Sequence, residues 1–311
     1  MKVSLICPVY NEEESIYSLI ESILLQTKKP DEIIFVDSLS KDNTAGIIKD
    51  YIKYTDKSIR LIERKTNIAQ ARNLAIKKSK NKIIACCDAS CVLEYDWLEK
   101  ITEPFNDINI DVVSGGYFAE GNTMIGKYIA MITVKPMDEW KEETFLPSSR
   151  SIAFRWSAWN DVGGYPVNDT ENNEAGEDTL FDLKLKEKGY KFKLQKNAIV
   201  YWKPRGNIKD FAKQFYRYGK GDYKSGNLRR IKKNLIAFTL MNIYLLCLGF
   251  SFLFNPLITL ILVCGLIGLF ILQGVKYTIK KKKIGCLFVI PFLMFIKRFS
   301  FFFGIWGGLL E

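Results

Sequence analysis

The chain contains no histidine among its 311 residues. This absence excludes Ser-His-Asp and Cys-His catalytic groups and the zinc sites that need paired histidines. General acid or base chemistry must then come from Asp, Glu, Lys, Tyr or Cys. A bound metal ion must be held by oxygen ligands, which favours magnesium or manganese.

Cysteine pairs of the CxxC type are also missing, although the chain has seven cysteines. An odd number without such a pair fits a reducing compartment. Cys86, Cys87 and Cys91 are close in sequence, but a zinc site needs a fourth ligand. We therefore expect buried thiols here.

Acidic residues are scarce at the C-terminal end. Of the 45 basic and 34 acidic residues, 18 basic and 3 acidic ones follow residue 202, which leaves 27 basic and 31 acidic residues before it. The net charge of +11 therefore belongs to the last third, and the rest of the chain carries −4. This distribution argues against a nucleic-acid-binding protein.

The same last third holds long uncharged apolar runs. Residues 234–254 and 257–275 are each long enough to span a bilayer, which takes about 20 apolar residues. Asn255-Pro256 between them predicts a tight turn and so a helical hairpin. Basic runs flank it, RRIKK at 229–233 and four lysines at 280–283. Because basic loops stay cytoplasmic, we expect residues 1–228 to lie in the cytoplasm.

A third apolar stretch covers residues 284–310 and is interrupted by Pro291 and by Lys297-Arg298. It fits a third span or an interfacial helix. We favour a re-entrant or interfacial helix, because the two charges fall in its middle. At the other end of the chain, MKVSLICPVYNEEES turns polar too early for a cleavable signal peptide.

Strand-like and helical patterns alternate through the first hundred residues. This order predicts a doubly wound, mostly parallel α/β sheet with helices on both faces. The expected strands are 2–7, 31–37, 58–63 and 82–88, and the expected helices are 12–27, 43–54, 69–79 and 96–105.

The alternation is looser after residue 110. A helix or flexible loop is expected within 119–147, a helix over 177–189 with Gly189 as its C-cap, and a basic, aromatic-rich helix within 207–233. The further strands expected are 112–118, 151–156 and two within 190–202.

Polar residues follow several of these strands, and IIACCDASCVLEYDWL at 83–98 is the clearest case. Its buried run ends in Asp88-Ala89-Ser90, Asp37 ends the second strand, and residues 8–12 follow the first. Ligands of such sheets bind beyond the carboxyl ends of the strands. These residues therefore predict one nucleotide-binding crevice.

The motifs CPVYNEEESI, VDSLSKDNT, ARNLAI, DAS, SSRSIAF, GGYP, GED and QFYRY follow one another in this order. The series resembles family 2 glycosyltransferases of the GT-A fold, over residues 1 to about 225. The membrane-anchored C-terminus is similar to members that act on lipid-linked or cell-surface glycans. The resemblance implies a GT-A-like catalytic domain at 1–228 and a membrane domain at 229–311.

The resemblance also implies residues that contact a nucleotide-sugar donor. Asp37 would contact the base or ribose, with a solvated acid that caps the next helix as the alternative. Pro8, Tyr10 and Glu12 would form the first nucleotide loop. Arg72 would either reach a phosphate or hold loops together through an ion pair.

Asp88 resembles the first acid of the family's DxD motif, in which alternate residues point to the same side. Ser90 stands where the second acid would be. Magnesium often uses one or two carboxylates together with phosphate oxygens and water. We therefore predict a Mg²⁺ or Mn²⁺ site at Asp88 and Ser90; the alternatives are an acid that only caps the strand end and an inactive, binding-only domain.

Glu177-Asp178 resembles the family's acidic pair, with Asp178 as the general base and Glu177 second. The alternative is an ordinary acidic helix start. Gly163-Gly164-Tyr165 would shape the acceptor side, and Trp156 and Trp159 would stack on a sugar or pack in the core.

Gln214 and Arg217 resemble the family's QxxRW element, with Tyr218 in place of Trp. Arg217 would stabilise the departing diphosphate. A membrane-surface helix is an alternative that does not exclude this role, since residues 203–233 carry 11 basic and 2 acidic groups that would attract anionic lipids.

The leading hypothesis is an inverting glycosyltransferase at the cell membrane. It would use a UDP- or GDP-sugar and a lipid-linked or cell-envelope glycan acceptor. The alternatives are a polyprenyl-phosphate glycosyl synthase and an inactive nucleotide-sugar-binding membrane protein. A processive synthase is disfavoured, because two or three spans cannot enclose a translocation channel.

Overall fold

The computed structural model of the chain describes residues 1–54, 59–167, 176–224, 226 and 232–311. They divide into two compact units, each described here by itself. The first unit holds residues 1–120, 134–167 and 177–204. The second unit holds 121–133, 176 and the described residues from 205 onward.

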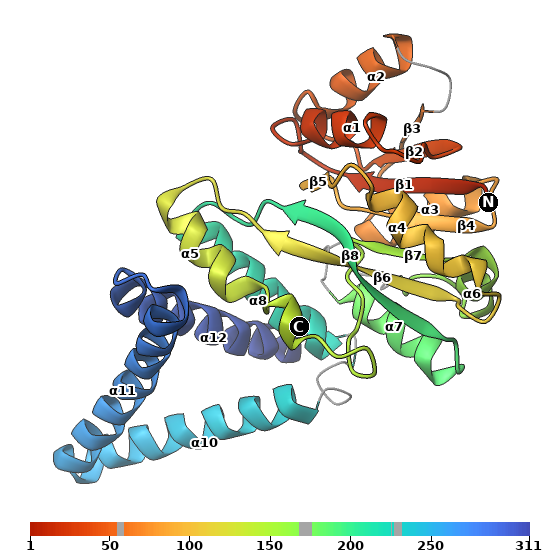
Figure 1. The fold of residues 1–311 in the computed structure, drawn as a ribbon. Helices are drawn as coiled ribbons and strands as arrows, with labels where there is room; N and C mark the ends of the chain where they lie inside the picture. The colour runs from red at the N-terminus through yellow and green to blue at the C-terminus, as the bar shows by residue number, and fades with distance from the viewer. Residues whose placement is uncertain (55–58, 168–175, 225, 227–231) are drawn as a thin grey trace. The chain divides into compact units, whose positions relative to one another are not determined.

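The first unit opens with the expected alternation of strands and helices (Figure 1). Each predicted element is present, with bounds that shift by a few residues. In chain order they are β1 (Val3–Val9), α1 (Ile16–Leu24), β2 (Glu32–Asp37), α2 (Thr44–Tyr54), β3 (Ile59–Glu63), α3 (Ile68–Lys78) and β4 (Ile83–Cys86).

The rest of the first unit differs from expectation in three places. The short elements β5 and α6 were not predicted, and residues 192–202 form one strand rather than two. The elements are β5 (Cys91–Leu93), α4 (Trp97–Thr102), η1 (Glu103–Asn106), β6 (Val112–Ala119), η2 (Met137–Glu139), β7 (Ile152–Arg155), α6 (Trp156–Asp161), α7 (Glu177–Glu187) and β8 (Phe192–Trp202).

All eight strands form one mixed sheet in the order β3-β2-β1-β4-β7-β6-β8-β5. The neighbours from β3 to β4 are parallel, as are β6 and β8, whereas β7 is antiparallel to β4 and β6 and β5 is antiparallel to β8. In the β4–β7 pair, Cys86 lies opposite Ile152 and Ile83 opposite Arg155. The start of β7 therefore lies at the carboxyl end of β4.

Apolar side chains cover both faces of this sheet, as expected for a strand buried on both sides. Leu5 of β1 joins one core and its neighbour Ile6 joins the other, because alternate residues of a strand point to opposite faces. Helices α1 and α4 cover the first face, and α3, α6 and α7 cover the second. The apolar side of α1 faces the core on the first face, since Ile16, Leu19, Ile20 and Ile23 are all fully buried.

The second unit consists of α5 (Met124–Thr133), α8 (Ile208–Lys224), α10 (Lys232–Phe254), α11 (Pro256–Lys281) and α12 (Cys286–Leu310). Among its described residues, the last three helices are long and apolar enough to cross a membrane. Asn255 caps α11 by accepting the N–H groups of residues 257 and 258, which gives the predicted turn. Part of the basic run at 229–233 lies outside the described residues.

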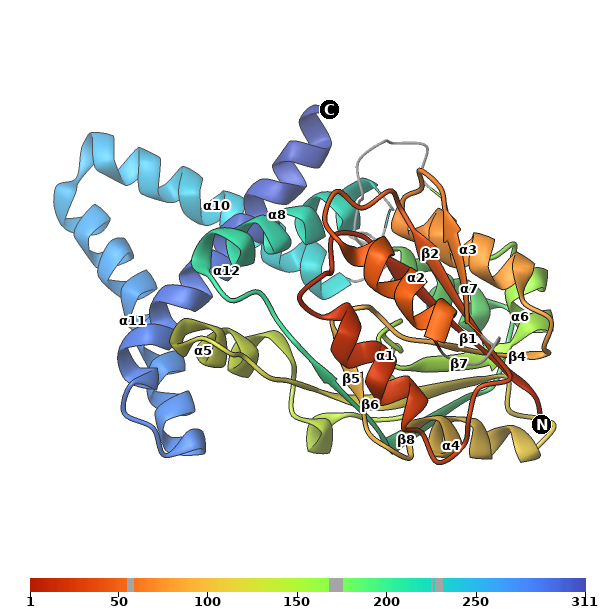
Figure 2. The ribbon, with the colours of Figure 1, turned by 90° about the horizontal axis from the view of Figure 1, so that it is seen from above.

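Helix α12 is continuous through Pro291 and packs against α8 and α5 (Figure 2). A Cβ on Gly219 of α8 would overlap the carbonyl oxygen of residue 301, and one on Gly304 would overlap that of Tyr216. The two helices therefore touch backbone to backbone. Lys297, one of the mid-helix charges, donates to the Ile132 carbonyl of α5 at 2.6 Å.

Candidate active site

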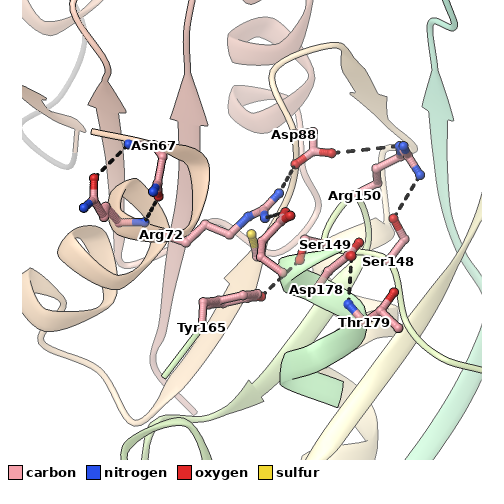
Figure 3. Close-up of polar contacts among 12 residues, drawn as sticks. Asn67, Arg72, Asp88, Ser148, Ser149, Arg150, Tyr165, Asp178 and Thr179 are labelled. Carbon is pink, nitrogen blue, oxygen red and sulfur yellow. Dashed lines mark hydrogen bonds and ion pairs between the residues drawn. The ribbon is translucent and has the colours of Figure 1, made fainter. Parts of the chain in front are cut away.

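Arg72 connects three of the motifs. Helix α3 begins at a capping box in which Asn67 and Gln70 bond each other's backbone N–H groups, which places Arg72 about one turn into the helix (Figure 3). Its Nη2 donates to Asp88 Oδ1 at 2.8 Å, and its Nη1 donates to Glu177 Oε1 at 2.5 Å. Of the two roles considered for Arg72, the structure shows the ion pair.

The Arg72 guanidinium is 2% exposed and lies 5.4 Å from the centre of the Tyr165 ring. Burial by itself lowers its pKa, but Asp88 and Glu177 outweigh burial and hold the pKa well above its ordinary value. Burial and the neighbouring Asp178 raise the pKa of Glu177, while Arg72 acts in the opposite direction. Arg72 is thus a fixed cation between two carboxylates from distant parts of the chain.

Asp178 follows Glu177 in the first turn of α7 and is only partly buried. One of its carboxylate oxygens accepts the backbone N–H of Thr179 at 2.8 Å (Figure 3). The contact fixes the side chain at the helix start. Glu177 faces Arg72, and Asp178 does not share that contact. The roles of the two acids remain predictions.

Asp88 lies just beyond the carboxyl end of β4, and its side chain is 23% exposed. The Ser90 hydroxyl accepts the indole N–H of Trp202 at 3.1 Å, and the Ser90 carbonyl accepts the Lys203 N–H. Among the described residues, no three carboxylate or thiol groups are placed so that they could hold a metal ion together. The donor set fits a Mg²⁺ or Mn²⁺ ion that takes one carboxylate and fills its remaining positions with phosphate oxygens and water.

Arg150 also faces Asp88, and it was not among the predicted site residues. Its Nε lies 3.9 Å from Asp88 Oδ2, and its Nη1 donates to Ser148 Oγ at 3.0 Å (Figure 3). The guanidinium stacks 4.1 Å from the centre of the Trp202 ring. The only sequence signal was the motif SSRSIAF, in which Arg150 stands directly before the expected strand at 151–156.

The loops that follow β1 and β2 are tied together by hydrogen bonds. The Asn11 N–H donates to Ser40 Oγ, the Glu12 N–H donates to Thr44 Oγ1, and the Lys41 N–H donates to Asn11 Oδ1. Asn11 has a φ of 54°, which turns the chain directly after the strand. The predicted nucleotide loop is thus a preformed surface at the carboxyl edge of the sheet.

Within this surface the predicted nucleotide contacts have different exposures. Asp37 is 1% exposed and accepts the Ser40 N–H at 3.0 Å, so it shapes the turn after β2. Pro8 is buried within β1, while Tyr10 is 45% exposed beside it. Glu12 accepts the Ser15 hydroxyl. Their contacts with a donor remain predictions.

The GGYP turn docks on Asn73, the residue after Arg72. The Asn73 side chain accepts the Tyr165 N–H at 2.9 Å and the Trp159 indole N–H at 3.0 Å, and donates to the Tyr165 carbonyl at 2.7 Å. Trp159 is buried and therefore packs in the core. Trp156 is exposed, but it follows Arg155 at the amino-terminal end of β4, away from Asp88.

Asp182 is a second residue that the sequence did not single out. It lies one turn after Asp178 on α7 and is 1% exposed. Neither of its carboxylate oxygens has a hydrogen-bond partner among the described residues. Burial, and then the charge of Asp178, raise the pKa of Asp182 well above its ordinary value.

Gln214 and Arg217 lie on α8, in the second unit. Gln214 is half-buried and donates to the Tyr218 hydroxyl at 2.8 Å, and Arg217 is exposed. The tyrosine that stands in place of Trp in this motif thus braces Gln214. The contact of both residues with a diphosphate remains a prediction.

Comparison with known proteins identifies the protein family to which the chain belongs. A family model described as glycosyl transferase family 2 matches residues 4–156, and one described as glycosyl transferase family group 2 matches residues 83–304. The second covers more than half of the chain. The chain therefore belongs to glycosyltransferase family 2, and it is a glycosyltransferase of GT-A-like fold with apolar C-terminal helices.

Among curated relatives, glycosyltransferase AglE of Haloferax volcanii is 26% identical over 74% of this chain and 75% of its own length. UDP-Glc:alpha-D-GlcNAc-diphosphoundecaprenol beta-1,3-glucosyltransferase WfgD of Escherichia coli is 32% identical, over 41% of this chain and 51% of its own. Among solved structures, the mannosyltransferase PcManGT of Pyrobaculum calidifontis, in complex with GDP-Man and Mn²⁺, matches with a TM-score of 0.67. That match is 16% identical and covers 99% of this chain and 87% of the other, so it supports the fold.

Proposed function

We propose that the chain transfers a sugar from a nucleotide-diphosphate sugar to a hydroxyl of a lipid-linked or cell-envelope glycan, with inversion at the anomeric carbon. The observation that carries this proposal is the Arg72 bridge, which joins the donor-side acid Asp88 to the acidic pair at the start of α7. The strand end proposed to bind the donor and the neighbour of the proposed base are thereby held by one cation.

In the proposed reaction, the acceptor hydroxyl oxygen attacks the anomeric carbon from the face opposite the diphosphate. A carboxylate oxygen of Asp178 takes the hydroxyl proton as the new carbon–oxygen bond forms. The bond to the diphosphate breaks, and the diphosphate leaves with the electron pair. One displacement of this kind inverts the configuration. Glu177 stays against Arg72 and orients the start of the helix.

Asp88, with the Ser90 hydroxyl beside it, would hold a divalent ion of the Mg²⁺ or Mn²⁺ class. Such an ion supplies positive charge to the departing diphosphate. The nucleotide-binding contacts assigned to Pro8, Tyr10, Glu12, Asp37, Gln214 and Arg217 belong to the same proposal. Arg217, as an exposed guanidinium on α8, suits a planar contact with phosphate oxygens.

The acceptor and the location follow from the apolar helices and from one relative. WfgD carries a diphosphoundecaprenol acceptor in its name, and three helices in the described part of the chain are apolar enough to cross a membrane. We propose a lipid-linked acceptor and a cytoplasmic catalytic domain at 1–228. Helix α12 suits an interfacial position, because its middle carries Lys297 and Arg298 and one side of it packs on the basic helix α8.

The test is binding and turnover of the detergent-purified full chain with a panel of UDP- and GDP-sugars. Asp178→Asn should bind the donor as the wild type does and lose about 10²- to 10⁴-fold in kcat. The control is Asp161→Asn, an exposed carboxylate paired with Lys188, which should keep full activity. A fully active Asp178→Asn enzyme would refute the base assignment and favour an acceptor that is already ionised, such as a polyprenyl phosphate. If no donor binds to the wild type, the proposal fails as a whole.

A further inference from the structure

Trp156 is an exposed tryptophan that the proposed function does not use. Of the six tryptophans, the other five each donate the indole N–H to a partner, whereas that of Trp156 has none among the described residues. Its side chain is 38% exposed. The four residues of β4, which span roughly 13 Å, separate it from the end of the strand that leads to Asp88. One exposed ring needs no explanation by itself, but Trp156 also lines a cavity.

The cavity lies in the first unit, at the amino-terminal end of β4, and has a volume of 450 Å³. Ligand pockets in proteins have volumes of about 300 to 1,000 Å³. Besides Trp156, the cavity is lined by Lys80, Asn81 and Lys82 from the loop between α3 and β4, and by Ser157 from α6. None of the described residues that line it is acidic. The lining therefore combines an aromatic ring, polar side chains and positive charge.

The backbone on both sides of the cavity is fixed by the sheet. The Trp156 N–H donates to the Lys82 carbonyl at 2.8 Å, which continues the pairing of β7 with β4. The Lys80 N–H donates to Oε1 of the buried Glu32 at 2.5 Å. The charge of Glu32 is in turn paired with Arg60 at 2.6 Å. The side chains in the cavity thus project from a backbone that is already held in place.

Two of these side chains carry positive charge without a partner. Lys80 and Lys82 are exposed, and neither forms an ion pair, a side-chain hydrogen bond or a ring contact among the described residues. The third cation of the lining, Arg155, is engaged elsewhere. Its guanidinium donates to three backbone carbonyls within 105–110 and lies 3.9 Å from the carboxylate of Asp111. The two lysines are therefore the groups that can meet an anion.

This combination suits a sugar that carries a phosphate. The apolar C–H face of a sugar ring can pack on the Trp156 ring, and sugar hydroxyls can bond to the side chains of Asn81 and Ser157. A phosphate monoester carries about 1.5 to 2 negative charges at pH 7, which two ammonium groups match. A neutral sugar would leave both lysines without a partner, and inorganic phosphate would leave the ring uncovered.

We propose that this cavity is a second binding site, which takes a phosphorylated saccharide and is separate from the donor site. The proposal goes beyond the proposed function and does not depend on the roles assigned to Asp88 and Asp178. Its ligand would be held by Trp156, Lys80 and Lys82, at the opposite end of β4 from the candidate active site.

Fluorine NMR of the purified full chain, labelled with fluorotryptophan, observes this cavity directly. Trp156→Phe identifies the Trp156 resonance. Titration with glucose 1-phosphate in EDTA should shift that resonance to saturation, with a Kd of about 0.1 to 1 mM. Glucose alone and inorganic phosphate alone should each bind at least about tenfold more weakly. The double variant Lys80→Gln/Lys82→Gln should bind glucose 1-phosphate about 5- to 20-fold more weakly than wild type.

Lys77→Gln is the matched control. Lys77 is an exposed lysine in the last turn of α3, close in sequence to the two others, and it does not line the cavity. Its loss should change the affinity by less than about twofold. Trp202 is an internal control in the same spectra, because its indole N–H bonds to Ser90 and so reports on the donor site. Its resonance should not follow glucose 1-phosphate.

Several outcomes would overturn the inference. They are a Trp156 resonance that does not shift to saturation, and equal affinities in Lys77→Gln and the double variant. Inorganic phosphate that binds as tightly as glucose 1-phosphate would show an adventitious ion only. UMP or GMP that binds more tightly would reassign the cavity to a nucleotide, and a parallel shift of Trp202 would place the ligand in the donor site. Failure of UDP and GDP with Mn²⁺ to move the Trp202 resonance would count against the proposed function without changing the result at Trp156.

Discussion

Arg72 and Glu177 are 105 positions apart in the chain, yet their side chains meet at 2.5 Å. The contact joins the third helix of the sheet to the first turn of α7, and the same guanidinium holds Asp88. One buried cation therefore links the strand end at Asp88 to the helix start at Glu177, the two places to which the proposed function assigns the donor site and the acidic pair.

Replacement of Arg72 should therefore affect stability as well as catalysis. Arg72→Met removes the cation that pairs with Glu177 and leaves Asp88 only the more distant Arg150, at 3.9 Å. Breaking a buried pair costs about 3 to 5 kcal/mol. We expect the free energy of unfolding to fall by at least half that amount, because Asp88 keeps some contact with water. Thermal unfolding of the purified wild-type and variant chains measures this difference.

The matched control for Arg72 is Lys49→Met. Lys49 also pairs with a carboxylate, that of Glu63 at 2.7 Å, but the two side chains are 56% and 42% exposed. The free-energy loss for such a pair should stay near or below about 1 kcal/mol. Equal losses in the two variants would show that the buried network is no more important than a surface pair.

The buried carboxyl of Asp182 should make the stability of the protein depend on pH. In the unfolded chain its carboxyl releases a proton near pH 4, whereas burial raises the folded-state pKa well above that. Below about pH 4 the carboxyl is protonated in both the folded and the unfolded chain, and burial of Asp182 carries no charge penalty. As pH rises toward the folded-state pKa, only the unfolded chain releases the proton, so the free energy of unfolding falls. Asp182→Asn should match wild type near pH 4 and exceed it by about 1 to 3 kcal/mol at pH 8.

The comparison is made by denaturant unfolding at several pH values, with Asp161→Asn as the control. The pKa of Asp161 is lowered by its hydrogen bonds with Lys188 and Tyr190, so its contribution has the opposite sign. That variant should lose stability relative to wild type as pH rises above about 4. A gain for Asp182→Asn that does not grow with pH would mean that Asp182 is ionised in the fold.

The first half of the fold was predictable because its strands and helices have strong periodicity. Strand β5 and helix α6, with three and six residues, are too short to show a period. Strand β8 was expected as two strands because Lys196-Asn197 interrupts its apolar pattern. It stays continuous because it pairs with β6 on one side, across a bulge at Gly115, and with β5 on the other. Such pairing depends on distant residues.

Part of the candidate site could be predicted because its residues stand at the ends of predictable elements. Asp88 and Glu177 stand in motifs at a strand end and a helix start, where the fold brings functional groups together. Arg150 reaches Asp88 only because β7 is antiparallel to β4, with Ile152 opposite Cys86. Asp182 lies in a charged helix, EDTLFDLKLKE, and looks like an ordinary exposed acid. Its burial depends on packing that no local pattern encodes.

Two neighbouring glycines of the GGYP turn allow the cost of a left-handed backbone conformation to be separated from the cost of a steric clash. Gly163 and Gly164 both have a φ of 76°. A Cβ on Gly163 would meet nothing within 4 Å, whereas one on Gly164 would lie 2.7 Å from Asn73 Oδ1. Gly163→Ala should cost about 1 to 2 kcal/mol from its left-handed conformation. Gly164→Ala should cost about 1 to 3 kcal/mol more, as thermal unfolding would show.

The close contact between α8 and α12 can be tested by adding a methyl group at Gly304. Gly304 lies where a Cβ would be 2.0 Å from the Tyr216 carbonyl oxygen, and backbone cannot yield as a flexible side chain can. Gly304→Ala should therefore destabilise the second unit by about 1 to 3 kcal/mol. Gly249→Ala on α10, where a Cβ meets nothing within 4 Å, should be neutral or stabilising by up to about 1 kcal/mol, since alanine favours a helix. Thermal unfolding in detergent distinguishes them, and equal melting temperatures for the two variants would show that α8 and α12 do not touch at Gly304.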